Sequence, residues 1–210
     1  MSAVAEPSRI RSSDDIARTY DRIAFLYDLY DAPMNAFGGR TRRRRVISRA
    51  QGSVLEVGIG TGANLDLYPA DVELIGVDIS AKMLAKARGR AARMGRPVAL
   101  READVERLPF HDASFDIVVA NCVFCSVGDP LRGLVEARRV VKPSGQVLLL
   151  EHVRPDGLAG RIADLVTPLT RKLIGPELNR RTEETVARSG LRIHDVRREG
   201  IWREIIATRD

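Results

Sequence analysis

Three alternating glycines and two nearby carboxylates are the residues of this chain whose types and spacing could do chemistry. They are Glu56, Gly58, Gly60, Gly62 and Asp78, and the apolar run around the first of them contains β-branched residues. Glycine lets a backbone turn sharply and approach a ligand closely because it has no Cβ. A helix that follows such a turn points its unpaired N–H groups at the ligand. The pattern therefore predicts a strand, a tight turn and a helix that together bind a small molecule.

The glycines alone leave two classes of ligand open. Gly58, Gly60 and Ala63 fit the G-x-G-x-x-G/A fingerprint of dinucleotide-binding enzymes. Asp78 follows Gly58 by 20 residues, where an NAD-dependent oxidoreductase keeps its ribose-binding acid. Glu56 and Gly62 lengthen the pattern to E-x-G-x-G-x-G. In this longer form it resembles the class I S-adenosylmethionine-dependent methyltransferases.

The resemblance covers about residues 50–155 in the order of that family. Residues 74–80 are similar to its second strand, 103–110 to the loop that holds the adenine, 114–121 to its fourth strand and 138–150 to its fifth strand and the turn before it. The resemblance implies that the cofactor is S-adenosylmethionine, with Asp78 on the ribose, Asp104 near the adenine amino group and Glu56 near the methionine ammonium. The full set of implied cofactor residues is Tyr20, Tyr27, Glu56, Gly58, Gly60, Gly62, Asp78, Ile79, Met83, Asp104, Val105 and Asn121.

Residues 1–49 are expected to form a helical lid on a cofactor-binding domain that spans residues 50–210. Ser12 and Asp15 make a capping-box pattern before apolar residues at helical spacing. The segment from Tyr20 to Asp28 resembles the Y-D-x-I-A-x-x-Y-D stretch of quinone and phosphatidylethanolamine methyltransferases, whose aromatic residues cover the cofactor. The alternative is that Tyr20 and Tyr27 only pack this helix on the domain.

Strand and helix patterns alternate beyond the glycine turn, which is typical of a doubly wound parallel sheet. Strands are expected at 98–103, 115–121 and 146–153, and helices at 81–94, 130–141 and 158–174, the last one bent or split at Pro168. Asn179 is expected to cap one more helix, and residues 191–198 and 201–208 to pair as an antiparallel hairpin. The predicted fold is α/β, with a Rossmann-like, seven-stranded, mostly parallel sheet and an antiparallel last strand, as in the class I methyltransferase fold.

The methyl acceptor is predicted only by resemblance. A sulfonium already activates its methyl group, so the enzyme mainly positions a nucleophile in line with it. His152 follows the fifth strand and is the candidate catalytic base, although a histidine there can also be purely structural. Residues 121–130, 150–153 and 175–182 resemble methyltransferase-like proteins that methylate alkyl thiols, which need little base because a thiol has a pKa near 8.5.

Three hypotheses about the function follow. The first is in-line methyl transfer to a small-molecule or lipid-like acceptor, a thiol among them. The second is N-methylation of phosphatidylethanolamine, because residues 20–28 and 65–69 resemble the bacterial enzymes that carry it out. The third is a non-catalytic protein that only binds S-adenosylmethionine.

Composition and charge limit the partners. The chain has 210 residues, 44% of them hydrophobic and 30% charged, with a net charge of +6, which fits one compact enzyme. The cluster from Arg40 to Arg45 is expected to be either a solvated helix face or a docking patch for an anionic membrane or a nucleic acid. Nucleic acid is disfavoured because the signatures of base-modifying methyltransferases are absent.

Cys122 and Cys125 are the only cysteines, which favours a reducing, cytoplasmic setting without disulfides. The dispersed histidines predict no metal site, and the oligomeric state is left open.

Overall fold

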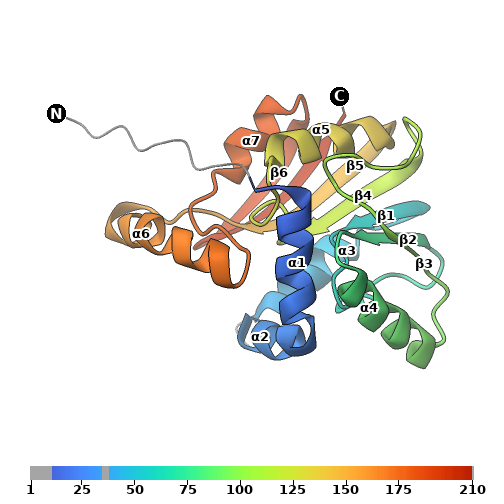
Figure 1. The fold of residues 1–210 in the computed structure, drawn as a ribbon. Coiled ribbons are helices and arrows are strands. Elements are labelled where there is room, and N and C mark those ends of the chain that lie inside the picture. Colours follow the sequence, from blue (N-terminus) through green and yellow to red (C-terminus); the bar gives the residue numbers. More distant parts are fainter. Residues whose placement is uncertain (1–10, 35–37, 210) are drawn as a thin grey trace.

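A seven-stranded sheet forms the centre of the protein, and helices cover both of its faces (Figure 1). The computed structural model describes residues 11–34 and 38–209. The strands are β1 (Ser53–Val57), β2 (Glu73–Asp78), β3 (Ala99–Glu102), β4 (Phe115–Asn121), β5 (Val141–His152), β6 (Arg192–Glu199) and β7 (Trp202–Thr208). Their order is β3-β2-β1-β4-β5-β7-β6. The strand pairs are parallel except that β7 runs antiparallel to both β5 and β6, which confirms the predicted fold.

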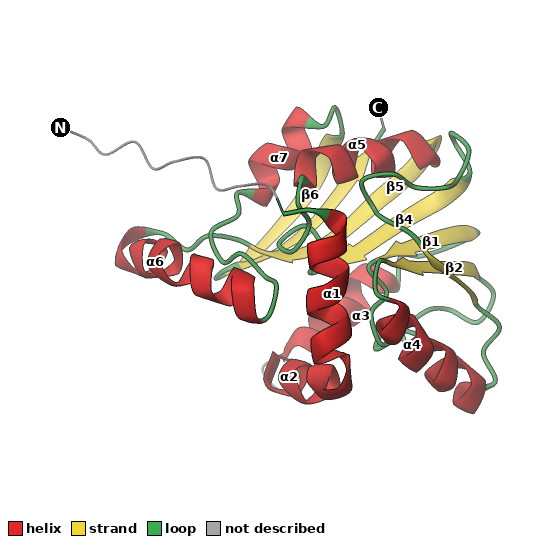
Figure 2. Cartoon of the chain, in the orientation of Figure 1, coloured by secondary structure: helices red, strands yellow, loops and turns green. Residues whose placement is uncertain are grey.

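The helices are α1 (Ser13–Ile23), α2 (Tyr27–Met34), α3 (Arg40–Ile47), α4 (Ala81–Met94), α5 (Pro130–Val140), α6 (Gly157–Leu173) and α7 (Thr182–Arg188), and the short 3₁₀ turn η1 (Ala24–Leu26) joins α1 to α2. Helices α5 and α7 lie on one side of the sheet, whereas α3 and α4 lie on the other (Figure 2). Each face buries its own cluster of aliphatic side chains, because successive residues of a strand point to opposite faces. Helix α1 covers neither face and crosses the edge where the parallel strands end (Figure 1).

Capping residues set several helix boundaries as predicted. The Ser80 hydroxyl accepts the Met83 N–H at 3.1 Å and begins α4, and Gly95 ends it in the left-handed conformation with φ of +61°. The Ser12 hydroxyl likewise accepts the Asp15 N–H at the start of α1. The apolar faces of α3, α4, α5 and α7 then fix these helices on the sheet.

Several local expectations were wrong. The helix expected directly after the glycine turn does not form, because residues 58–72 are a series of turns that joins β1 to β2. Asn179 does not cap α7, because its amide donates to Asp164 instead and the helix begins after Arg181. Pro168 does not split α6, which is a single helix with this proline in its interior. Strand β5 begins at Val141 rather than at residue 146, since an irregularity opposite Phe115 and Ile117 lets pairing with β4 start earlier. None of the helices in the described part of the chain has the length and apolar character needed to cross a bilayer.

Candidate cofactor pocket

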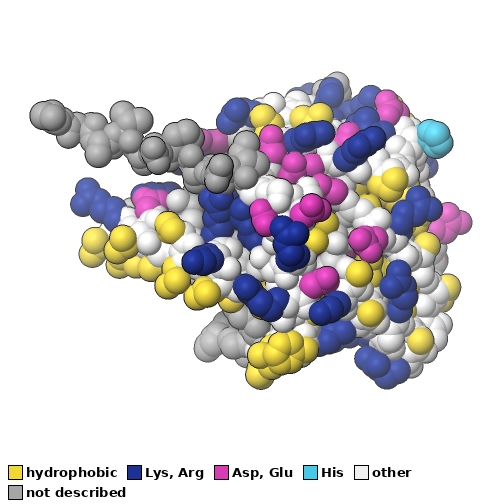
Figure 3. All heavy atoms as spheres, viewed as in Figure 1, with side chains coloured by type: hydrophobic (Ala, Val, Ile, Leu, Met, Phe, Trp, Pro, Cys, Tyr) yellow, Lys and Arg dark blue, Asp and Glu magenta, His cyan; other side chains and the backbone are white. Residues whose placement is uncertain are grey.

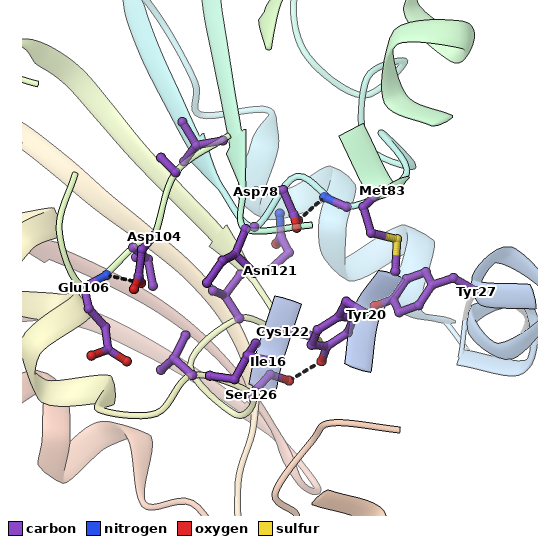
Figure 4. Close-up of a pocket in the computed structure, with 18 residues that line it drawn as sticks. Ile16, Tyr20, Tyr27, Asp78, Met83, Asp104, Glu106, Asn121, Cys122 and Ser126 are labelled. Atoms are coloured by element: carbon purple, nitrogen blue, oxygen red, sulfur yellow. Dashed lines mark hydrogen bonds between the residues drawn. The ribbon is translucent and has the colours of Figure 1, made fainter. Parts of the chain in front are cut away.

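A pocket lies at the carboxyl ends of β1, β2 and β4, under α1 (Figure 4). It holds about 690 Å³ of space, open solvent at its mouth included. Ligands of open α/β sheets bind at this edge of the strands. Ten of the predicted cofactor residues line it: Tyr20, Tyr27, Gly58, Gly60, Asp78, Ile79, Met83, Asp104, Val105 and Asn121.

The glycine turn lets the backbone form the pocket floor. Gly58 and Gly60 have φ of +62° and +58°, a left-handed conformation in which a Cβ is strained. A Cβ on Gly58 would lie 2.5 Å from Val123, whereas one on Gly60 would meet no protein atom within 4 Å. The backbone at Gly60 is therefore open to a ligand. Gly62 does not line the pocket. It lets the turn approach α4, because a Cβ there would lie 3.2 Å from the Cα of Ala87.

The carboxylate of Asp78 is held rigidly at the end of β2. Its two oxygens accept the Gly60 N–H at 2.8 Å and the Ser80 N–H at 2.9 Å. Burial raises the pKa of this carboxyl group to about 6, because low polarity disfavours its charged form. Each oxygen retains a lone pair that can accept a ligand hydroxyl. The carboxylate can thus take a pair of ribose hydroxyls without moving.

Apolar side chains and a second carboxylate form the next part of the wall. Ile79, Met83 and Val105 line the pocket with apolar side chains, against which a planar adenine ring can pack. Asp104 accepts the Glu106 N–H at 2.8 Å and the hydroxyl of Ser13, which comes from α1. The carboxylate therefore links the first helix to the rim of the pocket.

Glu56 lies beneath the pocket instead of lining it. Its side chain is 1% exposed and accepts an N–H of Asn64 at 2.6 Å. Burial raises the pKa of this carboxyl group to about 7. Side-chain orientation explains the position: Glu56 points to the face of the sheet that bears α3, where Asn64 and Tyr68 surround it.

Asn121 offers buried polar atoms to a ligand. Both polar atoms of its side chain are buried without a close hydrogen bond, and the side chain lies near the carboxyl group of Glu56. Asn121 lines the pocket at the end of β4. Burying such groups unpaired costs about 1–3 kcal/mol each, so they favour a ligand that carries both donors and acceptors. The amino-acid end of S-adenosylmethionine carries both, and the pocket fits that cofactor.

Helix α1 is fastened over the pocket by polar contacts. The Tyr20 hydroxyl donates to the Ser126 hydroxyl at 2.6 Å, and the Ser80 hydroxyl donates to Asp21 at 2.6 Å. Figure 4 shows Tyr20 beside both Cys122 and Tyr27, and the two tyrosine rings meet edge to face at 6.2 Å. Sequence reasoning did not select Ser126, since a lone serine in a loop carries no pattern.

His152 lies outside the pocket, which removes the structural basis for it as catalytic base. Its ring packs edge to face against Trp202 at 6.1 Å, on the side of the sheet that bears α3. Burial lowers its pKa to about 4, so it stays neutral near pH 7. His152 points away from the pocket because successive side chains of β5 lie on opposite faces of the sheet. The preceding residue, Glu151, is the one that points toward the loop beside the pocket.

Glu151 supports the loop that follows β4 and is absent from the predicted site residues. Its buried carboxylate accepts the N–H groups of Val123 and Phe124, each at 2.8 Å. These bonds hold Cys122, which lines the pocket with an unusual φ of +56°. Burial raises the pKa of Glu151 to about 7. The signal in the sequence was the position of Glu151 directly after the apolar strand run at residues 147–150, because a carboxylate there is buried at the edge of the sheet where ligands bind.

Salt bridges within the protein take up part of the arginine cluster, while Arg40 and Arg44 remain exposed. Arg42 pairs with Glu199 at 3.0 Å, Arg45 bonds Glu204 at 3.2 Å, and Arg43 is only 7% exposed. Arg40 pairs with Asp66. Arg42 and Arg45 thereby join α3 to the C-terminal hairpin.

Comparison with known proteins gives consistent results. The family model described as "Methyltransferase domain" matches residues 55–149. The phosphatidylethanolamine N-methyltransferase of Cereibacter sphaeroides is 38% identical over 147 residues, which cover 68% of this chain and 70% of that protein. The demethylmenaquinone methyltransferase of Deinococcus radiodurans is 34% identical over 155 residues. These residues cover 70% of this chain and 64% of that protein, which is slightly less than two thirds of its length.

Solved structures share the fold. An S-adenosylmethionine-dependent methyltransferase of Thermotoga maritima superposes with a TM-score of 0.71 at 20% identity, covering 93% of this chain and 100% of that one. The YcgJ protein of Bacillus subtilis superposes with a TM-score of 0.64 at 27% identity, covering 74% of this chain and 68% of that one.

Proposed function

The chain belongs to the S-adenosylmethionine-dependent methyltransferases of the class I fold, and on that premise we propose that it methylates the amine of an amphipathic, lipid-derived acceptor at a membrane surface. Phosphatidylethanolamine is the acceptor with the most support, because the relative named for it is 38% identical. We further propose that α1, with the rest of the N-terminal segment, acts as the lid of the site. The predicted cofactor residues that line the pocket are assigned to binding in this proposal.

The charge of the pocket wall is the observation that carries the amine assignment. Among the described residues, the lining includes the carboxylates Asp78, Asp104 and Glu106 and no Lys, Arg or His. Two tyrosine rings, Tyr20 and Tyr27, complete the wall. Aromatic faces attract ammonium groups, whereas a cationic wall would be expected for an anionic nucleophile such as a thiolate. The wall therefore favours an acceptor that becomes an ammonium ion on methylation.

The residues of the chain contribute positioning and exclusion of water. When bound, S-adenosylmethionine supplies a methyl group on a sulfonium sulfur, which is already activated for nucleophilic attack. Asp78 and Asn121 would fix the two ends of the cofactor, and Glu56 would pair with its ammonium through or beside Asn121. The free amine is the nucleophile, so the acceptor must release its proton to solvent before transfer. The carboxylates and the rings of Tyr20 and Tyr27 would then stabilise the positive charge that remains on the nitrogen after methylation.

A parallel acceptor assay tests this function. Purified protein is incubated with methyl-labelled S-adenosylmethionine and, separately, phosphatidylethanolamine in detergent micelles, a small alkyl thiol and a demethylated menaquinol. Label is expected in the phosphatidylethanolamine fraction. Tyr27→Leu should reduce kcat/KM for the amine by about two- to thirtyfold, because about 0.5–2 kcal/mol is lost with a cation–π contact, whereas Tyr27→Phe should retain most of it. Label on the thiol or the quinol with none on the amine would overturn the proposal.

A further inference from the structure

Helix α6 turns its apolar face away from the protein. Its five large aliphatic residues are Leu158 (72% exposed), Ile162 (54%), Leu165 (80%), Leu169 (60%) and Leu173 (52%). At about 100° per residue they fall within an arc of roughly 80°, so they form one continuous stripe along the helix. Figure 3 shows apolar side chains gathered along the outer edge of this helix. We call these five residues the α6 stripe.

The inward face of the same helix is made of small residues. Gly160, Ala163 and Thr167 are buried, and they lie opposite the α6 stripe on the helix. Gly160 is required there, since a Cβ would lie 2.3 Å from the carbonyl oxygen of Pro155. An ordinary surface helix buries its large apolar side chains and exposes its polar ones. Helix α6 does the reverse, so its sequence is suited to an apolar environment outside the protein.

Positive charge borders the stripe on the side that faces α1. Arg161 and Lys172 are exposed and lie on the helix next to the stripe. An open groove runs between α1 and α6, and Asp15 is the one carboxylate among the described residues that line it. Its cationic lining residues are Arg11, Arg18, Arg22, Arg171 and Lys172. Arg22 also donates to the carbonyl oxygen of Leu173 at 3.1 Å, which ties the lid helix to the end of α6.

A second apolar patch lies on the same side of the molecule. Phe25 in η1 is 72% exposed and Leu29 in α2 is 70% exposed. Figure 3 shows apolar side chains both along α6 and at the end of the molecule where η1 and α2 lie, on the lower side in this view. The lid helix α1 joins η1 and α2 directly and contacts α6 through Arg22. The two patches therefore flank the helix that covers the cofactor pocket.

We propose that the α6 stripe and the cationic groove beside it dock the protein on the surface of an anionic phospholipid bilayer. Helices that lie in a membrane interface combine an apolar face with flanking Lys and Arg, and they bind more strongly when the lipids are anionic. The stripe would enter the acyl boundary while the groove contacts lipid phosphates. This inference rests on the proposed function, because a lipid-derived acceptor lies in such a surface.

A second copy of the chain fits the same surface poorly. A twofold contact would bring the α6 stripe of two protomers together and place Arg161 and Lys172 close to their equivalents, where like charges repel. The stripe is also the convex face of a single helix. An anionic bilayer satisfies both the apolar stripe and the surrounding positive charge.

Vesicle flotation without S-adenosylmethionine tests the docking. The wild-type protein should float with vesicles that contain phosphatidylglycerol and bind vesicles of phosphatidylcholine alone at least tenfold more weakly. The stripe variant Leu165→Gln/Leu169→Gln should lose at least tenfold in affinity for the anionic vesicles, and so should Arg161→Gln/Lys172→Gln. Matched controls are Val135→Gln, an apolar residue 44% exposed on α5, and Arg88→Gln/Arg93→Gln on the exposed side of α4. Both controls should bind as the wild type does.

Methyl transfer in detergent micelles separates the docking from the proposed function. The stripe variant should retain turnover on micellar phosphatidylethanolamine while losing turnover on vesicles. Vesicle binding by the wild type without methylation of any lipid would remove the proposed function and leave the docking intact. Unchanged vesicle binding by the stripe variant would overturn the docking. So would a wild-type dimer in light scattering that the stripe substitutions convert to a monomer.

Discussion

Replacing Asp78 by asparagine should weaken the binding of S-adenosylhomocysteine by ten- to a hundredfold. Both oxygens of this carboxylate already accept backbone N–H groups, from Gly60 at 2.8 Å and Ser80 at 2.9 Å, and each can also accept one ribose hydroxyl. A hydrogen bond to a charged group contributes about 1.5–3 kcal/mol and one between neutral groups about 0.5–1.5 kcal/mol. Losing the charge therefore costs about 1.4 kcal/mol for each ribose hydroxyl, or roughly tenfold in affinity per bond.

Isothermal titration at pH 8 measures this loss, because Asp78, with its pKa of about 6, is then ionised. Glu102→Gln is the matched control: Glu102 pairs with Asp78 in the register of β2 and β3, yet it is exposed and absent from the pocket lining. The control should bind the ligand as the wild type does. Affinity of Asp78→Asn within twofold of the wild type, in a protein that remains folded, would refute the reasoning about the ribose contact.

Other predictions concern the glycine turn, the buried acids and the lid. Gly60→Ala should chiefly weaken cofactor binding, since its Cβ would enter open pocket space. Gly62→Ala should chiefly destabilise the fold, by about 1–3 kcal/mol, because its Cβ would meet α4. Equal losses of cofactor affinity and of unfolding free energy in the two variants, measured by calorimetry, would contradict this distinction. Glu56 and Glu151 have pKa values raised from 4.5 to about 7, so the stability that their neutral forms contribute is complete below about pH 4.5 and is lost as pH rises through 7. Glu151→Gln should flatten the fall in melting temperature between pH 5 and 8, and an unchanged slope would count against a buried ionisable carboxyl there. Tyr20→Phe removes the bond to Ser126 and should increase hydrogen exchange in α1 with a cost of about 0.5–1.5 kcal/mol; unchanged exchange would show that this bond does not fasten the lid.

The sequence predicted the sheet and the floor of the pocket because local patterns encode both. Gly58, Gly60 and Asp78 belong to one continuous strand-turn-strand segment, so their spacing alone places them at the same edge of the sheet. The hairpin of β6 and β7 was likewise encoded by two strand patterns with only Gly200 and one neighbour between them.

The failures involve contacts between distant parts of the chain. His152 faces away from the pocket because side chains along β5 alternate between the two faces of the sheet. Which face a given residue occupies depends on how the helices pack on each side, and the sequence of β5 alone does not show this. Arg45 is taken up by Glu204, which lies 159 residues later and carries no local signal of the pairing. The outward stripe of α6 was also hidden, since periodicity shows that a helix is amphipathic but not which face meets the protein.

A crystal structure of the protein with S-adenosylhomocysteine tests the central claim most directly. The account predicts the ribose hydroxyls on Asp78, the adenine between Ile79 and Val105, and the amino-acid end of the ligand against Asn121, whose side chain would gain its missing partners. A ligand bound elsewhere, or one in this pocket that leaves Asp78 and Asn121 without contact, would contradict it.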